Sequence, residues 1–342
     1  EGKDVGIGYL LYSTILRGHE RAYIRPDFQF TIELSSYDED SFKNAVASLW
    51  TAIYLGGFGT RARRGGGNIV VEKINGNTFN LDFIPKGVSS GNFYKWFKTN
   101  LDKCSNIIIN KDVKGKPKNF CTKYSNLSFS RVIISNQPFT NWKTTLNDIG
   151  KIYSDFRTKY RSDIFGTAVF GLPVRHGRLT VGWSKGTENF SRRSSPIIFN
   201  VIMIESNFFW YVIRLSGEIL EEGAIIKAHH TQKPNYKLID EFWSQLKNKG
   251  AEFILSQPEI LTKIIEKVKA ECNPDKIILF GSRARGDAHK NADIDIGVEN
   301  PKNSISSLNI NASLDIINLA KTSAGLKEKI KQEGVVVYER KS

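Results

Sequence analysis

The sequence predicts an α+β fold, with two ferredoxin-like units in tandem and a small α/β domain after them. Its length of 342 residues exceeds what one hydrophobic core usually fills, so several domains are expected. In two successive regions, strand and helix patterns follow the order of a β-α-β-β-α-β unit, and a third region carries a different strand, turn and strand pattern. The predicted parts are a first unit (1–90), an irregular connecting segment (91–126), a second unit (127–248), a linker (249–257) and the C-terminal domain (258–342).

The first unit is expected to hold strands at residues 6–17 and 27–35, because apolar residues alternate with polar ones in the second of these runs. A helix is expected over residues 41–55, where apolar residues recur at helical spacing, and a strand over residues 68–72. This order matches the second half of a ferredoxin-like unit. The first strand and helix of that unit are therefore expected to lie before Glu1, which is not a methionine.

A glycine-rich loop with three arginines, residues 54–67, lies between this helix and the strand predicted after it. Its six glycines allow backbone conformations that other residues rarely adopt, and its arginines carry permanent positive charge. The interleaving of the two residue types favours a clamp on a nucleic-acid backbone over a flexible linker, which would carry more serine. The predicted RNA contacts of this clamp are Gly57, Gly59, Arg61, Arg63 and Arg64.

The connecting segment has no clear pattern apart from an amphipathic stretch at residues 91–101 and a basic run at residues 111–118. A solvated loop explains the basic run more simply than an RNA-facing surface does. No regular fold is predicted for this segment.

The second unit shows clearer periodicity. An alternating strand at residues 127–135 is followed by a helix at residues 142–160, whose apolar residues recur at helical spacing. Strands at residues 197–204 and 208–215 and a helix at residues 236–247 are expected to complete the unit.

Basic residues gather between the first helix and the later strands of the second unit. Arginines flanked by hydroxyl groups suit phosphate oxygens, which accept both charge-assisted and neutral hydrogen bonds. The alternative is that Arg192 and Arg193 cap the entrance of a strand and pair with acidic neighbours. His176 is interpreted as an RNA-contacting or structural group rather than as a general base. The predicted phosphate contacts are Arg175, Arg178, Arg192 and Arg193.

The net charge of +14 indicates an anionic partner, and the composition favours nucleic acid over a membrane. No run approaches the roughly 18 apolar residues of a membrane span, and no signal-peptide pattern is present. Cys104, Cys121 and Cys272 are widely spaced and odd in number, which predicts free thiols rather than disulfides or a zinc site. A soluble cytoplasmic protein is expected.

The sharpest chemical signature lies in residues 276–298. Gly281 and Ser282 follow an apolar strand and can offer backbone N–H groups and a hydroxyl to the phosphates of a nucleotide. Asp293 and Asp295 alternate with isoleucines on the next strand, so both carboxylates face the same side and can bind divalent cations. A metal ion and a nucleoside triphosphate are the ligands that this arrangement suits.

This signature resembles the minimal nucleotidyltransferases of the polymerase-β superfamily, whose pattern is Gly-Ser, about ten residues, then Asp-x-Asp. Ten residues separate Ser282 from Asp293 here, and Ala292 stands where the family usually has serine. The resemblance implies a third carboxylate on a later strand, bound Mg²⁺ and a nucleoside triphosphate, with ATP as the first candidate. The implied catalytic and metal-binding residues are Asp293, Asp295 and Asp315, and the implied nucleotide-binding residues are Gly281 and Ser282. The same spacing also occurs in domains that bind nucleotide without turnover, so enzymatic activity is left open.

The glycine-rich loop, the run at residues 165–173 and the segment at residues 191–196 together resemble the RAMP superfamily of CRISPR-associated RNA-binding proteins. Within it they look most like the head subunit of the type III-B (Cmr) effector complex, over about residues 1–248. The resemblance implies a tandem ferredoxin-like fold with no cleavage activity of its own. It also implies contacts with the 3′ part of the guide RNA, with target RNA and with other Cmr subunits in an antiviral ribonucleoprotein complex.

The charge distribution agrees with this division. Residues 258–342 contain 14 Lys or Arg and 12 Asp or Glu, so nearly all of the basic excess lies in residues 1–257. The first functional hypothesis is an RNA-binding subunit with an appended nucleotidyltransferase-like domain. The alternative is a nucleotidyltransferase that moves a nucleoside monophosphate onto protein or RNA, with the basic region as its substrate platform. A third and weaker hypothesis is an antitoxin-like module that modifies a partner ribonuclease.

Overall fold

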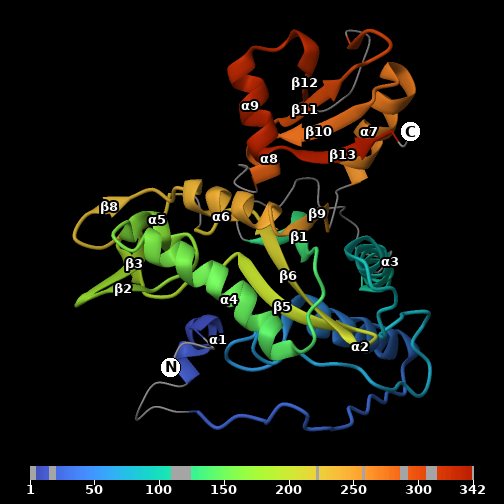
Figure 1. Cartoon of the computed structure of the whole chain (residues 1–342), viewed down its shortest axis with the longest axis vertical. Helices are drawn as coiled ribbons and strands as arrows, with labels where there is room; N and C mark the ends of the chain where they lie inside the picture. Colours follow the sequence, from blue (N-terminus) through green and yellow to red (C-terminus); the bar gives the residue numbers. More distant parts are fainter. Residues whose placement is uncertain are drawn as a thin grey trace.

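The computed structural model describes residues 5–14, 21–108, 125–220, 223–255, 259–285, 292–305 and 314–340. It shows an α+β fold with one four-stranded sheet at the centre and another in the C-terminal domain, which lies at the top of Figure 1. The predicted α+β class and the C-terminal α/β domain are confirmed. Among the described residues, no helix combines the length and apolarity that crossing a bilayer requires. The basic run at residues 111–118 lies outside the described residues.

The second predicted unit forms the central sheet, whose strand order is β5-β6-β1-β9 and whose neighbouring strands are all antiparallel. With α4 and α6, these strands follow the chain order β-α-β-β-α-β of a ferredoxin-like unit. The elements are β1 (Asn126–Ser135), α4 (Trp142–Lys159), β5 (Ile197–Ile204), β6 (Asn207–Ser216), α6 (Lys237–Lys247) and β9 (Gly250–Ile254). The strands and helices predicted between residues 127 and 247 are confirmed, each within one residue of its predicted ends.

The linker predicted at residues 249–257 is wrong for residues 250–254, because these form β9. This strand pairs with β1 from Ser135 opposite Gly250 to Arg131 opposite Ile254. A Cβ atom at Gly250 would lie 2.5 Å from the carbonyl oxygen of Ile134, so the pairing requires glycine at this position. β9 therefore completes the ferredoxin-like sheet.

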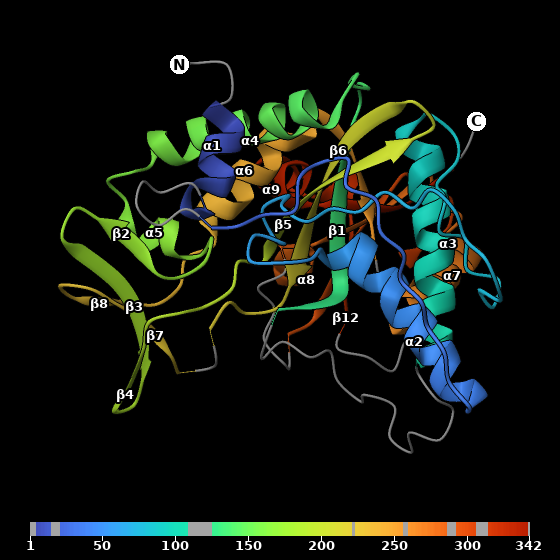
Figure 2. The ribbon, with the colours of Figure 1, turned by 90° about the horizontal axis from the view of Figure 1, so that it is seen from below.

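The two faces of the central sheet carry separate hydrophobic cores. Successive residues of a strand point to opposite faces, so Ile133 packs with α4 and α6 while Val132 and Ile134 face the other way. The second face is covered by α2 (Glu39–Thr51) and α3 (Ser90–Ile108). Figure 2 shows α2 and α3 on one side of β1 and α4 on the other.

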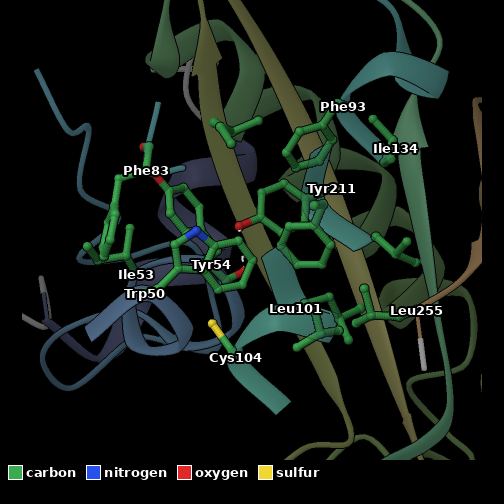
Figure 3. Close-up of a cluster of buried hydrophobic side chains, with 14 of the residues drawn as sticks. Trp50, Ile53, Tyr54, Phe83, Phe93, Leu101, Cys104, Ile134, Tyr211 and Leu255 are labelled. Atoms are coloured by element: carbon green, nitrogen blue, oxygen red, sulfur yellow. Dashed lines mark hydrogen bonds between the residues drawn. The ribbon is translucent and has the colours of Figure 1, made fainter. Parts of the chain in front are cut away.

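Figure 3 shows the core under α2 and α3, where large aromatic side chains meet. Trp50 and Phe93 are fully buried there, and the hydroxyl of Tyr211 donates a hydrogen bond of 2.8 Å to the carbonyl oxygen of Tyr54. This contact joins β6 to the turn that leads into the glycine-rich loop. The N-terminal helices are thus bound to the ferredoxin-like sheet rather than to a sheet of their own.

The main error of the sequence prediction concerns the first ferredoxin-like unit, whose predicted strands are not formed in the described part of the chain. The strand predicted at residues 6–17 is wrong over its described part: residues 5–11 form helix α1 (Val5–Leu11), followed by a 3₁₀ turn, η1 (Tyr12–Thr14). The N–H of Gly6 donates to the side-chain oxygen of Asn147 at 2.9 Å, because α1 packs closely on α4. The strands predicted at residues 27–35 and 68–72 are also wrong, since no neighbouring strand in the described chain bonds to them.

The helix predicted at residues 41–55 is confirmed as α2 and the π-helical turn η2 (Ala52–Gly56). Asp38 precedes α2, and its carboxylate accepts a hydrogen bond of 2.7 Å from the N–H of Ser41. Within residues 91–126, where no regular fold was predicted, the amphipathic stretch belongs to α3. Cys104 and Cys272 are buried free thiols, as predicted, and Cys121 lies outside the described residues.

A small second sheet is inserted in the ferredoxin-like unit, with strand order β2-β3-β7-β8 and β4 paired to β3. It packs with the short helix α5 around its own hydrophobic core. Its elements are α5 (Ile164–Ala168), β2 (Val174–His176), β3 (Leu179–Lys185), β4 (Glu188–Phe190), β7 (Ile225–Lys227) and β8 (Thr231–Gln232). The segment that carries four of the predicted arginine contacts thus belongs to this inserted sheet and its connection to β5.

The C-terminal domain has the strand order β12-β11-β10-β13, in which β11 and β12 are parallel and the other pairs antiparallel. The apolar strand expected before Gly281, the strand expected to carry Asp295 and the later strand expected to carry Asp315 are confirmed. Its elements are α7 (Glu259–Cys272), β10 (Lys276–Phe280), α8 (Gly281–Arg285), β11 (Ile294–Glu299), β12 (Leu314–Asn318), η4 (Leu319–Lys321), α9 (Ala324–Glu333) and β13 (Val335–Glu339).

Phe129 of β1 joins the two modules. Its side chain is 6% exposed and belongs to the hydrophobic core of the C-terminal domain. Its backbone φ is +59°, and it lies where the register between β1 and β6 shifts. The guanidinium of Arg283 lies 5.8 Å from the centroid of its ring. The ferredoxin-like sheet therefore contributes directly to the core next to the Gly-Ser turn.

Candidate nucleotide-binding site and basic surfaces

The predicted carboxylates meet at the β11–β12 edge of the C-terminal sheet. Asp295 on β11 lies opposite Asp315 on β12 in a parallel register, and Asp293 directly precedes β11. Asp295 is half-buried, whereas Asp293 and Asp315 are exposed. Residues opposite each other in a parallel pair point to the same face, so the register brings two of the three predicted metal ligands together.

The site is electrostatically unfavourable for an ionised Asp295. Burial raises the pKa of Asp295, and the carboxylates of Asp315 and Asp293 raise it further, while Arg285 lowers it. A divalent cation would relieve this repulsion, and carboxylate oxygens are the ligands that Mg²⁺ prefers. In the described part of the chain, no three Asp, Glu, His or Cys side chains already lie close enough to hold a metal ion. The donor set fits Mg²⁺, but the three carboxylates have to move together to bind it.

The turn after β10 has the close backbone approach that its glycine predicts. Gly281 has a φ of +71°, and a Cβ atom on it would lie 2.0 Å from a carboxylate oxygen of Asp295. Its N–H donates a hydrogen bond of 3.2 Å to Glu333 at the end of α9. A nucleotide phosphate would therefore compete with Glu333 for this N–H. Ser282, beside it, is partly exposed.

Two functional candidates were missed in the sequence, Arg285 and Glu333. Both carboxylate oxygens of Glu333 accept hydrogen bonds of 3.0 Å from the guanidinium of Arg285, and Glu333 also accepts the hydrogen bond from Gly281. The ion pair is thus bound to the Gly-Ser turn. The carbonyl oxygen of Arg285 accepts a hydrogen bond from Arg214 of β6. The spacing of the motif includes neither Glu333 nor Arg214, because both reach the turn only through tertiary packing.

Divalent-cation binding at this site is expected to strengthen as the pH rises. A carboxyl group with a raised pKa in the folded state stabilises the fold below its unfolded value of 3.8, and that contribution is lost as the pH rises through the folded value. Ionised Asp295 is thus both destabilising and able to bind a cation. Thermal melts with and without Mg²⁺, from about pH 4 to about pH 8, should show stabilisation by Mg²⁺ that grows with pH. An effect of Mg²⁺ that does not depend on pH would contradict this assignment.

The glycine-rich loop is seated on the edge strand β5 of the central sheet. The N–H of Phe199 donates to the carbonyl oxygen of Arg63 at 3.2 Å, and Arg64 forms an isolated bridge with Phe199. Gly57 and Gly59 have φ values of +129° and +89°, which only glycine adopts readily. The loop therefore follows the sheet as an ordered segment and is not a flexible linker.

The arginines of this loop bind protein atoms. A guanidinium nitrogen of Arg64 donates to the carbonyl oxygen of Phe170 at 3.1 Å, and the group lies 4.9 Å from the ring centroid of Tyr153. The guanidinium of Arg63 donates to the carbonyl oxygen of Ser195. Arg64 is therefore partly a packing residue, which the sequence interpretation as a simple clamp did not include.

A local excess of positive charge is nevertheless present at the loop. Burial lowers the pKa of Arg61 and of Arg63, and the neighbouring charge of Arg64 lowers both further. Arg61 lies over the ring of Tyr12, and its Nε is buried without a hydrogen-bond partner in the described part of the chain. An anion at this loop would relieve the mutual repulsion of the arginines.

The four arginines of the inserted region are not equivalent. Arg175 on β2, Arg178 and Arg192 are exposed. Arg193 is partly buried, donates its Nε–H to the carbonyl oxygen of Ile219 and pairs through its backbone with Leu172. The first three are open to solvent, whereas Arg193 holds the entrance to β5 by donating to carbonyl oxygens; the alternative interpretation had expected both Arg192 and Arg193 to pair with acidic neighbours there.

The fold and the site thus define a ferredoxin-like module joined to a nucleotidyltransferase domain. Residues 262–342 match the protein-family model described as "Polymerase beta, Nucleotidyltransferase". The chain therefore carries a domain of this type at the end predicted from the Gly-Ser and Asp-x-Asp spacing.

The comparison with curated proteins finds two Cmr subunits of Pyrococcus furiosus. The chain is homologous to subunit Cmr1-1, with 28% identity over 219 residues, which cover 63% of this chain and 61% of the relative. Subunit Cmr1-2 is 56% identical over 46 residues, which cover 14% of this chain and 25% of the relative. The chain thus spans about three fifths of the length of the first relative.

Two solved structures are similar to parts of the chain. The apo crystal structure of Cmr1 from Pyrococcus furiosus has a TM-score of 0.45 and 21% identity, and the match covers 75% of this chain and 72% of that chain. A cryo-EM structure of the type III-B Cmr-beta complex bound to cognate target RNA has a chain with a TM-score of 0.37 and 17% identity, covering 63% of this chain and 54% of that chain.

Proposed function

We propose that the chain is an RNA-binding RAMP subunit of a type III-B CRISPR effector complex, with an appended nucleotidyltransferase domain. The homology to Cmr1-1 over 219 residues carries this proposal. The ferredoxin-like sheet and the basic excess outside the C-terminal domain support it. The proposed partners are the 3′ part of the guide RNA, target RNA and other Cmr subunits.

The proposed RNA surface has two parts. The exposed arginines Arg175, Arg178 and Arg192 would contact phosphates from the inserted sheet and its connection to β5. The loop from Gly57 to Arg64 would add backbone N–H groups and the charge of Arg61. Because phosphate contacts carry no sequence information, binding should be strongly salt-dependent and weakly sequence-specific.

Replacing Arg175, Arg178 and Arg192 together with alanine is expected to weaken RNA binding without lowering the melting temperature. For single strands, each lost phosphate contact makes the slope of log affinity against log salt concentration shallower by about 0.7. The slope of the triple variant should therefore be shallower than that of the unaltered chain by up to about 2. Filter binding of single-stranded RNA at several salt concentrations measures the slope. A matched control replaces three exposed lysines of the C-terminal domain, Lys321, Lys327 and Lys331, with alanine. Equal salt slopes for the two variants would show that these three arginines do not contact RNA.

The nucleotidyltransferase domain is the basis of the alternative function, an enzyme that transfers a nucleoside monophosphate. Asp293, Asp295 and Asp315 would hold Mg²⁺, and Ser282 would donate to the phosphates of a nucleoside triphosphate such as ATP. The metal, when bound, would neutralise the charge that develops on the transferred phosphoryl oxygens. Arg285 and Glu333 would keep the Gly-Ser turn in position. The parallel register of Asp295 and Asp315 is the observation that favours this activity.

A further inference from the structure

A cavity of about 690 Å³ opens between the ferredoxin-like module and the C-terminal domain. One side is formed by β1, β6 and α6, and the other by the end of α8 and by α9. Figure 1 shows α6 of the lower module beneath α8 and α9 of the upper domain. Ligand sites commonly lie at such domain interfaces and have volumes of this size.

The wall on the ferredoxin-like side is fixed by buried ion pairs. Arg214 pairs with Asp240 at 2.7 Å, and its side chain is 4% exposed. Arg131 pairs with Glu252 at 3.1 Å, and its side chain is 5% exposed. Because these guanidinium groups already have carboxylate partners, they shape the wall but leave little charge for a ligand.

Two lysines supply the charge that faces the cavity. Five cationic and three anionic side chains line it, which leaves an excess of positive charge. Lys237 of α6 is 75% exposed, and its contact with Glu241 is a long one of 3.9 Å. Lys329 of α9 is exposed on the opposite wall. An anionic ligand can therefore be held between the two modules by these exposed ammonium groups, which are favourable for phosphate.

The cavity adjoins the Gly-Ser turn. Glu333 and Arg285 line it, and Glu333 accepts the hydrogen bond from the N–H of Gly281. Both residues also act electrostatically on Asp295. A ligand in the cavity thus contacts the two residues through which the cavity is linked to the Gly-Ser turn and to Asp295.

We propose that this cavity binds the phosphate backbone of the RNA that accepts the transferred nucleotide. The proposal rests on the proposed function and names RNA, not protein, as the acceptor. In the transfer, a hydroxyl oxygen of the RNA bonds to the α-phosphorus of a nucleoside triphosphate and the bond to the bridging oxygen breaks. Pyrophosphate leaves, and the hydroxyl proton passes to water. Tyr236, which also lines the cavity, offers an aromatic surface to a base.

The test compares two double charge reversals in the full chain. Lys237→Glu with Lys329→Glu changes the cavity, and Lys321→Glu with Lys331→Glu makes the same change in net charge outside its lining and away from the inserted sheet. Residues 329 and 331 are two apart on α9 and do not face the same side. Fluorescence anisotropy with a single-stranded oligoribonucleotide should show a salt slope about 1.4 smaller for the cavity variant than for the control. The affinity for ATP with Mg²⁺ should be the same in both.

The outcomes separate the two proposals. Equal salt slopes in variants of a chain that binds RNA would overturn the cavity assignment and leave the RNA-binding function standing. If the unaltered chain binds no RNA, both proposals fail. A selective loss of ATP affinity in the cavity variant would show that the cavity holds the donor nucleotide, and would overturn the acceptor assignment. Label from α-labelled ATP that accumulates in protein and not in RNA would contradict it as well.

Discussion

Replacing Asp295 with asparagine is expected to reduce nucleotidyl transfer by about a thousandfold, which corresponds to about 4 kcal/mol of lost transition-state stabilisation. Asp295 lies at the centre of the site: it is opposite Asp315 in the sheet register and in close contact with the Gly-Ser turn. Asparagine keeps the shape but removes the charge that would hold a divalent cation. The measurement is transfer of label from α-labelled ATP in the presence of Mg²⁺ and single-stranded RNA.

The same substitution is expected to leave the fold intact or slightly more stable in the absence of metal. The raised pKa of Asp295 shows that its ionised form is disfavoured in the folded state, so a neutral side chain removes an unfavourable charge. The matched control is Asp275→Asn, which changes a partly exposed aspartate of the same domain paired with Lys302. Transfer that persists in the Asp295 variant, or is lost equally in the control, would exclude Asp295 as a metal ligand.

Replacing Glu252 with alanine is expected to destabilise the protein by about 3–5 kcal/mol, because it leaves a buried cation without its partner. Glu252 on β9 accepts hydrogen bonds from Arg131 at 3.1 Å, from Lys247 at 2.8 Å and from the indole of Trp243 at 2.6 Å. Burial lowers the pKa of Arg131 to about 10, so its guanidinium is still charged at neutral pH. Urea unfolding measures the loss. The control Glu271→Ala breaks a partly exposed pair with Lys267 and should cost less than about 1 kcal/mol.

The pH dependence gives this prediction a second readout. Burial alone would raise the pKa of Glu252, but Arg131 and Lys247 lower it, and the net value lies below the usual 4.5. A carboxylate with a lowered pKa contributes stability above its unfolded value and loses it as the pH falls through its folded value. The gap in stability between the unaltered chain and the alanine variant should therefore shrink below about pH 4.5. A gap that is constant with pH would indicate lost packing instead of a lost charge.

The sequence predicted the fold well where each element carries its own periodicity. The strands β1, β5 and β6 of the central sheet and the helix α4 follow from apolar spacing alone, whereas β9 lies in a segment predicted to be a linker. The prediction failed at residues 27–35, where the alternation of Phe28 and Phe30 suggested a strand but both side chains are more than half exposed. A strand needs a neighbour to satisfy its hydrogen bonds, and a single-sequence pattern does not show whether that neighbour exists.

The candidate site was predictable only in its local part. Asp293 and Asp295 share a motif with Gly281 and Ser282, so spacing was enough to find them. Glu333 and Arg214 reach the same turn from other elements, and no spacing relates them to it. In the glycine-rich loop the error was the opposite one, because residues were predicted to contact RNA although they bind protein atoms. Charge and glycine content do not distinguish an arginine that faces a ligand from one that, like Arg64, binds a carbonyl oxygen and two aromatic rings.

The position of Phe129 limits how this protein can be dissected. Its ring completes the hydrophobic interior of the nucleotidyltransferase domain, although it belongs to a strand of the other module. A fragment that starts at α7 would open a hole beside Arg283 and expose the apolar residues around it. Such a truncated piece is expected to fold poorly by itself, and activity assays on it would report on a damaged domain. The two halves are best purified as one polypeptide.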